Sequence, residues 1–329
     1  MLDRKIKLKL ETLTDLPTIP FVLTEVLHAL DDTEMRASHL AGLIQRDQTL
    51  TARVLKVANS PFYGFARRIS TIDLAIVLLG TNTIKEIVIG LVLQKFISKS
   101  RRSTLDTKAF WEYSVFCGAA ARVLARKLKY RLAGEAFVAG LMHDIGILIM
   151  SEFFSKEFRQ VRSFQERFGK YMLDAEIMAF RCTHSDIGSW FAERWYLPRQ
   201  LCESIRYHHD SYTEMRENKK KEDENRKDNR IFNSNDKKQK KEPETDEHLI
   251  SIVAMAEWFA LECGFKKWTY DQRQPPLFLA NEILETLGEH EILSKESAID
   301  ILKTEIMEEY EKAAAFTEIA TRPVYSSSL

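Results

Sequence analysis

Histidine and aspartate residues occur at three places along this 329-residue chain in arrangements that could bind metal ions. Imidazole and carboxylate groups are ligands for Zn, Mn, Fe and Mg ions. An aspartate beside a histidine can offer one oxygen to each of two ions, and two such ions can activate a water molecule and hold a phosphoryl group. The candidate metal ligands are His143, Asp144, His184, His208 and His209.

The same five residues also have a purely structural interpretation. The pair His143-Asp144 could be hydrogen-bonded within a packed core, because buried polar groups need such partners. His184 falls at an expected helix start and could be a solvated turn residue. His208 and His209 fall in a last helical turn, where an imidazolium suits the negative end of the helix dipole. If the residues do bind metal, we expect one divalent ion (Zn, Mn, Fe or Mg) and no other cofactor.

The elements that must position these residues are helices, because apolar residues recur with helical period along nearly all of the chain. The alternation of apolar and polar residues that is typical of strands is hard to find. Residues 136–150 are nearly all apolar and must lie centrally, and a longer helix is expected over residues 84–97. The sequence therefore predicts an all-α fold.

Several helix boundaries are indicated by capping residues. Asp47 is placed to cap a helix, and Thr183 with Asp186 has the spacing of a capping box. Ser70 begins a second stretch with the same spacing, ahead of an apolar segment that Gly80 is expected to end.

Residues 59–64, Asn-Ser-Pro-Phe-Tyr-Gly, predict a helix stop followed by a tight turn. We expect Phe62 and Tyr63 to pack between two helical blocks. The alternative is a recognition loop in which the nearby Arg67 and Arg68 pair with carboxylates or phosphates of a partner.

Changes in composition suggest the domain organisation. A basic cluster near residues 99–102 indicates a boundary between an N-terminal helical subdomain, 14–104, and a second helical subdomain, 105–264. About two-thirds of residues 214–247 are charged. Such a segment cannot bury enough apolar surface to offset its ordering entropy, so we predict a disordered insertion, with a docking tail as the alternative. Residues 265–329 are expected to add helices that complete or flank the domain.

Charge and cysteine content limit the classes of function. The 48 basic and 48 acidic side chains balance, which argues against non-specific binding of duplex nucleic acid. The four cysteines form no Cys-x-x-Cys pair, as expected for reduced thiols in the cytosol. We take residues 84–97 as the most apolar stretch, and they are interrupted by charges and too short to span a bilayer. No signal peptide is visible. We expect a cytoplasmic protein with neither a membrane nor a nucleic-acid partner.

The motifs of the chain resemble those of a known family. Residues 140–146, Gly-Leu-Met-His-Asp-Ile-Gly, look like the signature of the HD superfamily of metal-dependent phosphohydrolases. Residues 58–64, Ala-Asn-Ser-Pro-Phe-Tyr-Gly, and the later stretch 187–209 are similar to the HDOD branch, the HD-related output domain. The likeness covers about residues 14–264. It implies an all-α, HD-like domain with an N-terminal helical subdomain and a role in bacterial signal transduction.

Three positions depart from the pattern that the resemblance implies for catalytic relatives. Tyr113 stands where they have a histidine, Glu257 where they have an aspartate, and Ile147 where the cyclic-di-GMP phosphodiesterase relatives have a lysine. A phenol with a pKa near 10 is a poor metal ligand at pH 7. A glutamate in place of an aspartate moves the carboxylate by roughly 1.5 Å, more than metal–ligand distances tolerate. We therefore expect a site that is too distorted for a reaction with two ions.

The sequence thus favours a non-catalytic regulatory module of the HDOD type that acts through protein–protein or small-ligand contacts. We expect a signalling protein as its partner, and a homodimer is a further option. The alternative is a metal-dependent phosphohydrolase or phosphodiesterase with a reduced, one-metal site on the candidate ligands.

Overall fold

The chain folds into packed helices. The computed structural model describes residues 4–12, 37–60, 62–65, 67–99, 104–168, 172–210, 246–265 and 296–321. Every regular element within these residues is a helix and none is a strand, which confirms the all-α prediction. Nearly all of the predicted insertion at 214–247, and residues 266–295 of the C-terminal part where further helices are expected, lie outside the described residues.

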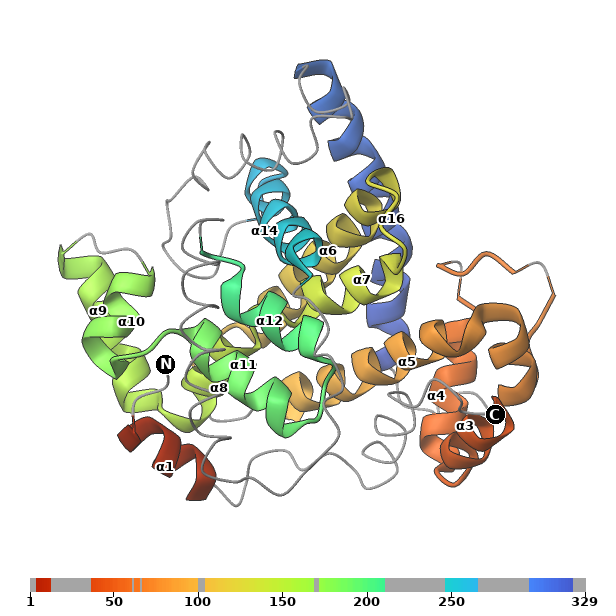
Figure 1. Ribbon diagram of the computed structural model, residues 1–329, viewed down its shortest axis with the longest axis horizontal. Helices are drawn as coiled ribbons and strands as arrows, with labels where there is room; N and C mark the ends of the chain where they lie inside the picture. Colours follow the sequence, from red (N-terminus) through yellow and green to blue (C-terminus); the bar gives the residue numbers. More distant parts are fainter. Residues whose placement is uncertain are drawn as a thin grey trace, which may run out of the picture.

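The described helices between residues 37 and 80 form a lobe, the N-terminal lobe, at one side of the molecule (Figure 1). This lobe contains α3 (Ala37–Gln45), α4 (Gln48–Ala58) and the first part of α5 (Ile72–Lys99). Helix α4 begins where predicted, because the Asp47 side chain accepts hydrogen bonds from two backbone N–H groups of its first turn.

Helix α5 shows which local predictions held. The predicted cap at Ser70 is wrong by one residue, because the Thr71 hydroxyl accepts the backbone N–H of Leu74. Gly80 does interrupt the helix, with a φ of 82° that glycine adopts more readily than other residues. The helix predicted over 84–97 is the second part of α5, which continues from that kink into the centre of the molecule (Figure 1).

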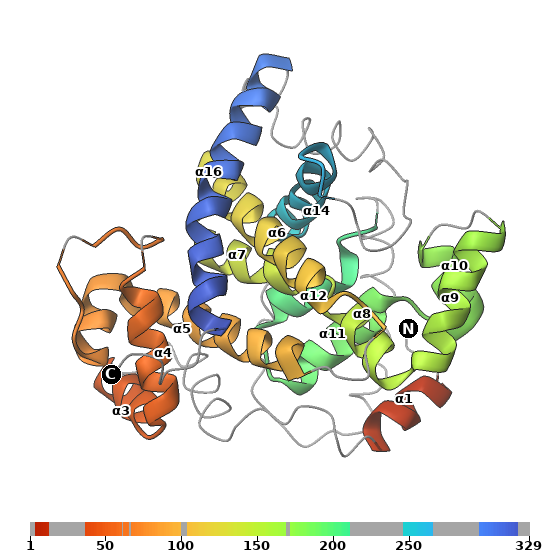
Figure 2. The same ribbon diagram turned by 180° about the vertical axis from the view of Figure 1, so that it is seen from behind.

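Two layers of helices form the centre (Figures 1 and 2). The upper layer in Figure 1 contains α6 (Thr107–Lys127), α7 (Ala133–Met142), α14 (Glu247–Glu262) and α16 (Glu296–Thr321). The lower layer contains α8 (Ile145–Phe153), α11 (His184–Arg194) and α12 (Arg199–Tyr207). Helix α16 packs against α6, so this C-terminal helix covers the HD-like part of the chain.

The apolar stretch at 136–150 lies in the core as predicted, but it is divided between α7 and α8. By length and composition, Ala133–Phe153 could cross a membrane, and 89% of its most apolar window is buried inside the protein. Residues 72–97 meet the same criteria only as a bent pair of helices. The break between α7 and α8 falls at His143 and Asp144, so two polar residues stand in the middle of the most apolar part of the core.

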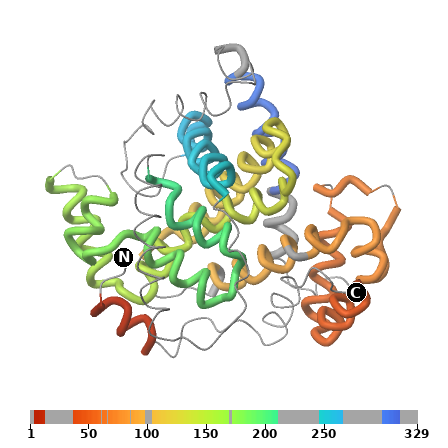
Figure 3. Tube along the Cα trace, viewed as in Figure 1, coloured from red at the N-terminus to blue at the C-terminus, as the bar shows by residue number. Residues whose placement is uncertain are grey.

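Helices α9 (Ser155–Phe168) and α10 (Met172–Phe180) form a hairpin that projects from the other side of the molecule (Figure 3). Helix α1 (Arg4–Thr12) lies at the base of this hairpin, where the Lys9 ammonium is 3.4 Å from the Glu157 carboxylate. The buried Ile6 and Leu10 anchor α1 to the core.

Residues 59–64 join the two helical blocks as predicted. The Phe62 ring lies 5.6 Å from the Phe137 ring of α7, and the Arg122 guanidinium of α6 lies 4.5 Å from the centre of the Phe62 ring. The Asn59 side chain closes the turn through hydrogen bonds of 2.7–2.8 Å with the backbone N–H and carbonyl of Ile69.

The predicted insertion ends earlier than expected. Asp246 caps α14 by accepting the backbone N–H of Leu249, and Glu247 is the first residue of that helix. The charge run therefore includes a helix start, because an aspartate at the cap and a glutamate in the first turn both favour one.

Candidate metal centre

His143 and Asp144 lie in the break between α7 and α8, and both side chains are fully buried. His143 follows the last turn of α7, and Asp144 precedes the first turn of α8. The Asp144 carboxylate therefore points into the core at a place where no other acidic oxygen of α7 or α8 is buried. A buried carboxylate requires positively charged or hydrogen-bonding neighbours.

Close packing between α8 and α11 brings the second part of the chain to this aspartate. A Cβ atom added to Gly146 would clash with the carbonyl oxygen of His184, and one added to Gly188 would lie 3.1 Å from the Gly146 nitrogen. Only residues without a side chain permit this approach. As a result the Nε2 atom of His184 lies 3.2 Å from the Oδ1 atom of Asp144.

The predicted capping box at the start of α11 is present. The Thr183 hydroxyl accepts the Asp186 backbone N–H, and the Asp186 carboxylate accepts the Thr183 backbone N–H. Since His184 is the first residue of α11, this cap fixes its backbone.

His208 and His209 follow the end of α12 and complete the cluster. The Nε2 atom of His208 lies 3.6 Å from Asp144 Oδ1, and the Nε2 atom of His209 lies 3.0 Å from His184 Nε2. His143 approaches the other carboxylate oxygen, at 3.4 Å. The structure thus brings all five predicted residues together around Asp144.

Three of the imidazole rings are held in the same way. The Nδ1 atoms of His143 and His208 each lie 2.7–2.8 Å from the backbone carbonyl three residues earlier, and Nδ1 of His184 lies 2.9 Å from the Glu176 carboxylate. These oxygens only accept, so each Nδ1 carries the hydrogen. In the neutral rings Nε2 then presents its lone pair, and all three face Asp144. Metal-binding histidines show this arrangement, in which the second ring nitrogen donates to an acceptor.

The ligand atoms have the spacing that one ion needs. Neighbouring ligands on a tetrahedral ion with bonds of 2.0–2.1 Å lie about 3.3 Å apart. Among Asp144, His184, His208 and His209, three separations between ligand atoms, 3.0, 3.2 and 3.6 Å, bracket this value, and all of the separations are within 4.8 Å. In addition, Nε2 of His143, Nε2 of His208 and both Asp144 oxygens are buried and make no hydrogen bond. A cation is the simplest partner for the Asp144 oxygens and for Nε2 of His208.

A second group of candidate ligands contains a residue that the sequence had set aside. One ligand atom each from His143, His208 and Glu257 lies within 4.8 Å of the others. The Glu257 carboxylate therefore lies near two of the candidate ligands, and the expectation that its longer side chain misplaces it as a metal ligand stays a prediction. His208 has only one Nε2 lone pair, however, so it cannot serve both groups at once. The group of Asp144, His184, His208 and His209 offers four ligands to a single ion.

The electrostatics of the centre are dominated by Asp144. Burial raises the pKa of this carboxyl, but the charge on His143 and its contacts with three histidines hold the pKa well below its usual range. Burial lowers the pKa of His184, but the Glu176 and Asp144 carboxylates outweigh it and raise that pKa to about 10. Burial lowers the pKa of His208. Without a metal ion, the cluster thus holds protons in its place.

The other two departures from the catalytic pattern lie beside the centre. The Tyr113 ring is buried, with its centroid 5.9 Å from that of His143. Burial, followed by the charges of neighbouring groups that include Glu257 and Asp144, raises the pKa of Tyr113 well above its usual value. Ile147 is also buried and brings no charge to the site.

Glu176 is a functional candidate that the sequence analysis missed. Its carboxylate accepts hydrogen bonds from both the ring and the backbone N–H of His184. The available signal was weak: Glu176 stands between Met172 and Phe180 at helical spacing, so an acid occupies the apolar face of α10. Only the folded structure shows which residue it contacts.

Comparison with known proteins places this arrangement in a family. The family model of the HDOD domain matches residues 16–211. An uncharacterised protein of Treponema pallidum (strain Nichols) is 27% identical over 208 residues, which cover 61% of this chain and 39% of the relative. The chain thus spans about two-fifths of the length of this curated relative.

Solved structures share the fold at low sequence identity. An HDOD domain protein of unknown function from Geobacter sulfurreducens has a TM-score of 0.69 and 23% identity, covering 95% of this chain and 96% of that chain. A candidate signal transduction protein from Marinobacter aquaeolei VT8 has a TM-score of 0.67 and 17% identity, covering 98% and 62%. A candidate phosphohydrolase from Shewanella amazonensis SB2B has a TM-score of 0.65 and 19% identity, covering 95% and 98%. Together with the match to more than half of the chain, these likenesses show that the chain belongs to the HDOD domain family.

Proposed function

We propose that this HDOD chain is a regulatory module of bacterial signal transduction that binds one divalent metal ion and does not turn over phosphoesters. One observation carries the proposal: three imidazole Nε2 atoms with their Nδ1 atoms already hydrogen-bonded converge on one buried carboxylate. Lone pairs that face a carboxylate in a dry core repel it unless a cation or protons lie between them.

The ion would be held by Asp144, His184, His208 and His209. Three imidazoles and one carboxylate suit Zn²⁺ and other first-row divalent ions better than Mg²⁺, which prefers oxygen ligands. Bound there, the ion would supply the positive charge that Asp144 lacks in the neutral cluster. Its ligands come from the α7–α8 break, α11 and the end of α12, so they would join three parts of the core.

The surroundings favour a regulatory function over hydrolysis. His143, Asp144 and His208 are at most 1% exposed, so their side chains offer almost no surface to a phosphoester. Ile147 offers no charge for a phosphate, and the buried Tyr113 stays a neutral phenol near pH 7 because its pKa is raised.

A metal-dependent phosphohydrolase is the second candidate function. The observation in its favour is the Glu257 carboxylate, which reaches His143 and His208 and could help to hold a second ion. An assay with bis-p-nitrophenyl phosphate and added Mn²⁺ or Zn²⁺ separates the two functions. The regulatory proposal expects no metal-dependent turnover; turnover that disappears in Asp144→Asn supports the hydrolase.

Metal binding is tested by thermal unfolding of untagged protein with and without Zn²⁺. An ion that binds only the folded state at 100 times its Kd stabilises it by about 2.7 kcal/mol. We expect a rise in Tm with Zn²⁺ that Asp144→Asn abolishes. An unchanged Tm at saturating Zn²⁺ argues against the proposal.

We further propose that the module works in the cytoplasm with a signalling protein as partner. The family assignment supports this. Size-exclusion chromatography with light scattering at several protein concentrations tests whether the chain forms a homodimer.

A further inference from the structure

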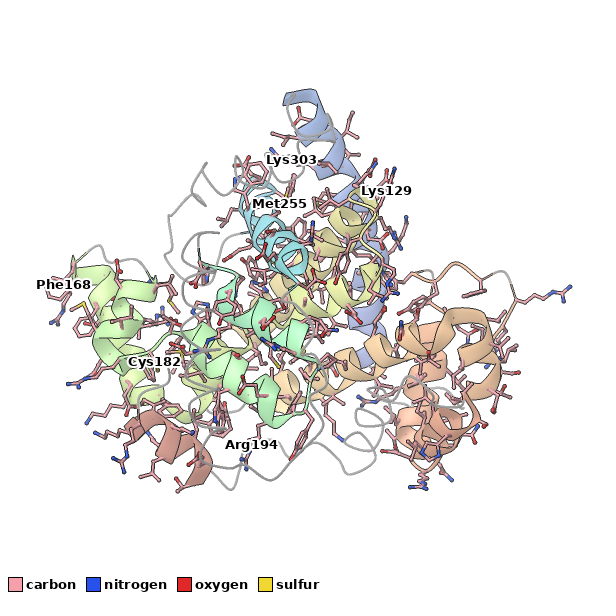
Figure 4. All side chains as sticks on the ribbon, in the orientation of Figure 1. Lys129, Phe168, Cys182, Arg194, Met255 and Lys303 are labelled. Atoms are coloured by element: carbon pink, nitrogen blue, oxygen red, sulfur yellow. The ribbon has the colours of Figure 1, made fainter. Side chains whose placement is uncertain are left out.

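The α9–α10 hairpin contacts the metal centre through the Glu176 side chain. Helix α10 packs chiefly against α9, and the pair projects away from the remaining helices in both views (Figures 1 and 2). Phe168 lies at the outer end of the hairpin and Cys182 near its base (Figure 4). Ile177 and Met178 lie on the exposed face of α10. The neighbouring Glu176 is completely buried.

Glu176 makes hydrogen bonds with two different groups of His184. Both carboxylate oxygens lie 2.9 Å from the ring Nδ1, and Oε2 lies 2.8 Å from the backbone nitrogen. The ring and the backbone of this residue are therefore fixed by the same acid. Charge-assisted hydrogen bonds of this kind are about twice as strong as neutral ones.

The second of these hydrogen bonds explains why an acid is needed at this place. His184 is the first residue of α11, and the first N–H groups of a helix have no partner within it. Thr183 accepts the N–H of Asp186, which leaves the N–H of His184 for another acceptor. The helix dipole favours a negative charge here.

The chain between Glu176 and His184 is short and held in an uncommon conformation. Arg181, just after the end of α10, has a φ of 58°, in the left-handed region that is unfavourable for a non-glycine residue. Such residues persist where their surroundings fix them. The turn and the Glu176 carboxylate together hold the hairpin in one position relative to α11.

We propose that Glu176 is a positioning residue that keeps the His184 ring with its Nε2 lone pair toward Asp144, so that the α9–α10 hairpin is part of the metal centre. This inference rests on the metal binding proposed above. Without the acid, the ring can rotate or shift its hydrogen to Nε2, and either change removes one of the four ligands. Loss of such a supporting partner typically weakens metal binding 10- to 100-fold.

The substitution Glu176→Gln tests the inference with little change in shape. A glutamine has no negative charge, and if its oxygen takes the place of Oε2, its NH₂ group stands in the place of Oε1, 2.9 Å from the Nδ1–H donor of His184. We expect the Kd for Zn²⁺, measured by competition with a chelator, to rise 10- to 100-fold. We also expect a changed visible absorption spectrum of the Co²⁺-loaded protein, a readout that reports the ligand set and not the stability of the fold.

The matched control is Glu309→Gln, which removes a buried carboxylate far along the chain on α16. That carboxylate lies 3.3 Å from the Arg126 guanidinium and makes no contact with the centre. The control should leave both the Kd for Zn²⁺ and the Co²⁺ spectrum unchanged. If Glu176→Gln binds Zn²⁺ within twofold of wild type with an unaltered Co²⁺ spectrum, the inference is wrong although the metal proposal stands.

A measurement on the unmodified protein keeps the inference testable if Glu176→Gln does not fold. Long-range ¹⁵N–¹H NMR of histidine rings in the Zn²⁺-loaded protein shows which ring nitrogen carries hydrogen. We expect the His184 signal to have hydrogen on Nδ1 and the metal on Nε2. Coordination of His184 through Nδ1 overturns the inference, whereas wild-type protein that binds no Zn²⁺ overturns the proposed function with it.

Discussion

At the scale of single residues, the centre can bind either protons or a metal ion. Asp144 is buried among three imidazoles, and its charge must be balanced by one or the other. In the metal-free protein the raised pKa of His184, about 10, means that this ring holds a proton at pH 7. A metal ion that binds through Nε2 must displace that proton, so binding and pH are linked.

Metal affinity should therefore fall as the pH is lowered. Between pH 6 and pH 8 we expect the Kd for Zn²⁺ to increase at least tenfold for each unit of decrease in pH, because binding releases one proton or more. Chelator competition at pH 6, 7 and 8 measures this slope. Calorimetry in two buffers with different ionisation heats counts the released protons, and a Kd that does not vary with pH contradicts the account.

The stability of the metal-free protein should change with pH in the opposite direction, because of His184. Its pKa is raised in the folded state, so its contribution to stability is complete below pH 6.5 and is lost as the pH rises toward 10.

The substitution Asp144→Asn should remove metal binding without unfolding the chain. An amide has no negative charge, so we expect the Kd for Zn²⁺ to rise on the order of 100-fold or more. The exposed Asp300→Asn serves as the control, since it also removes one carboxylate. Equal Zn²⁺ affinity in the two variants would show that Asp144 is not a ligand.

The sequence identified five of the residues that meet at the centre because they belong to motifs of two adjacent polar residues or stand at a helix start. It did not identify Glu176, and it did not predict that Glu257 lies near His143 and His208. Both depend on where α10 and α14 pass relative to the His-Asp pair, and helix packing at that precision is not encoded in local spacing.

At the scale of elements, two glycines determine how closely α8 and α11 pack. Gly146→Ala would place a methyl group against the His184 carbonyl, so one helix must move and carry Asp144 or His184 with it. We expect this variant to lose about 1–3 kcal/mol of unfolding free energy, with a parallel loss of Zn²⁺ affinity.

The control for this variant is Gly42→Ala in α3. No atom lies within 4 Å of the added methyl group, and alanine is a better helix former by about 0.5–1 kcal/mol. Denaturant unfolding measures the unfolding free energy of both variants. If Gly146→Ala and Gly42→Ala are equally stable, α8 and α11 do not pack as described.

Helix types and most boundaries followed from the sequence, and the exceptions have physical reasons. The predicted caps Asp47 and Thr183 are confirmed, because each side chain accepts a backbone N–H in the first turn of its helix. The predicted cap Ser70 is not, because Thr71 offers an equivalent hydroxyl one residue later. The division of the apolar stretch into α7 and α8 was also invisible to periodicity, which stays apolar across the break.

At the scale of the whole molecule, Arg122 connects the N-terminal lobe to the helices that carry the candidate metal centre. Its guanidinium lies 3.2 Å from the Glu86 carboxylate of α5 and 3.9 Å from that of Glu309 on α16, and it also contacts the Phe62 ring. All three charged side chains are at least nine-tenths buried. Burial raises the pKa of Glu86 to about 7, although the Arg122 charge opposes this shift.

Removing this arginine should destabilise the entire chain. Arg122→Met leaves two buried carboxylates without their shared cation, and we expect a loss of about 3–5 kcal/mol in unfolding free energy at pH 8. The loss of unfolding free energy should be smaller near pH 5. Glu86, whose pKa is about 7, is protonated there and leaves no buried charge unpaired. The double variant Arg122→Met/Glu86→Gln should recover part of it; a double variant no more stable than Arg122→Met contradicts the assigned pairing.

The metal content of untagged protein purified from its host tests the central claim most directly. Elemental analysis is predicted to find about one divalent transition-metal ion per chain, retained in Asp300→Asn and lost in Asp144→Asn, because a competent buried site stays largely filled. Less than about 0.1 ion per chain in the wild-type protein, an order-of-magnitude threshold, would show that the histidines and Asp144 form a hydrogen-bonded core cluster and not a metal centre.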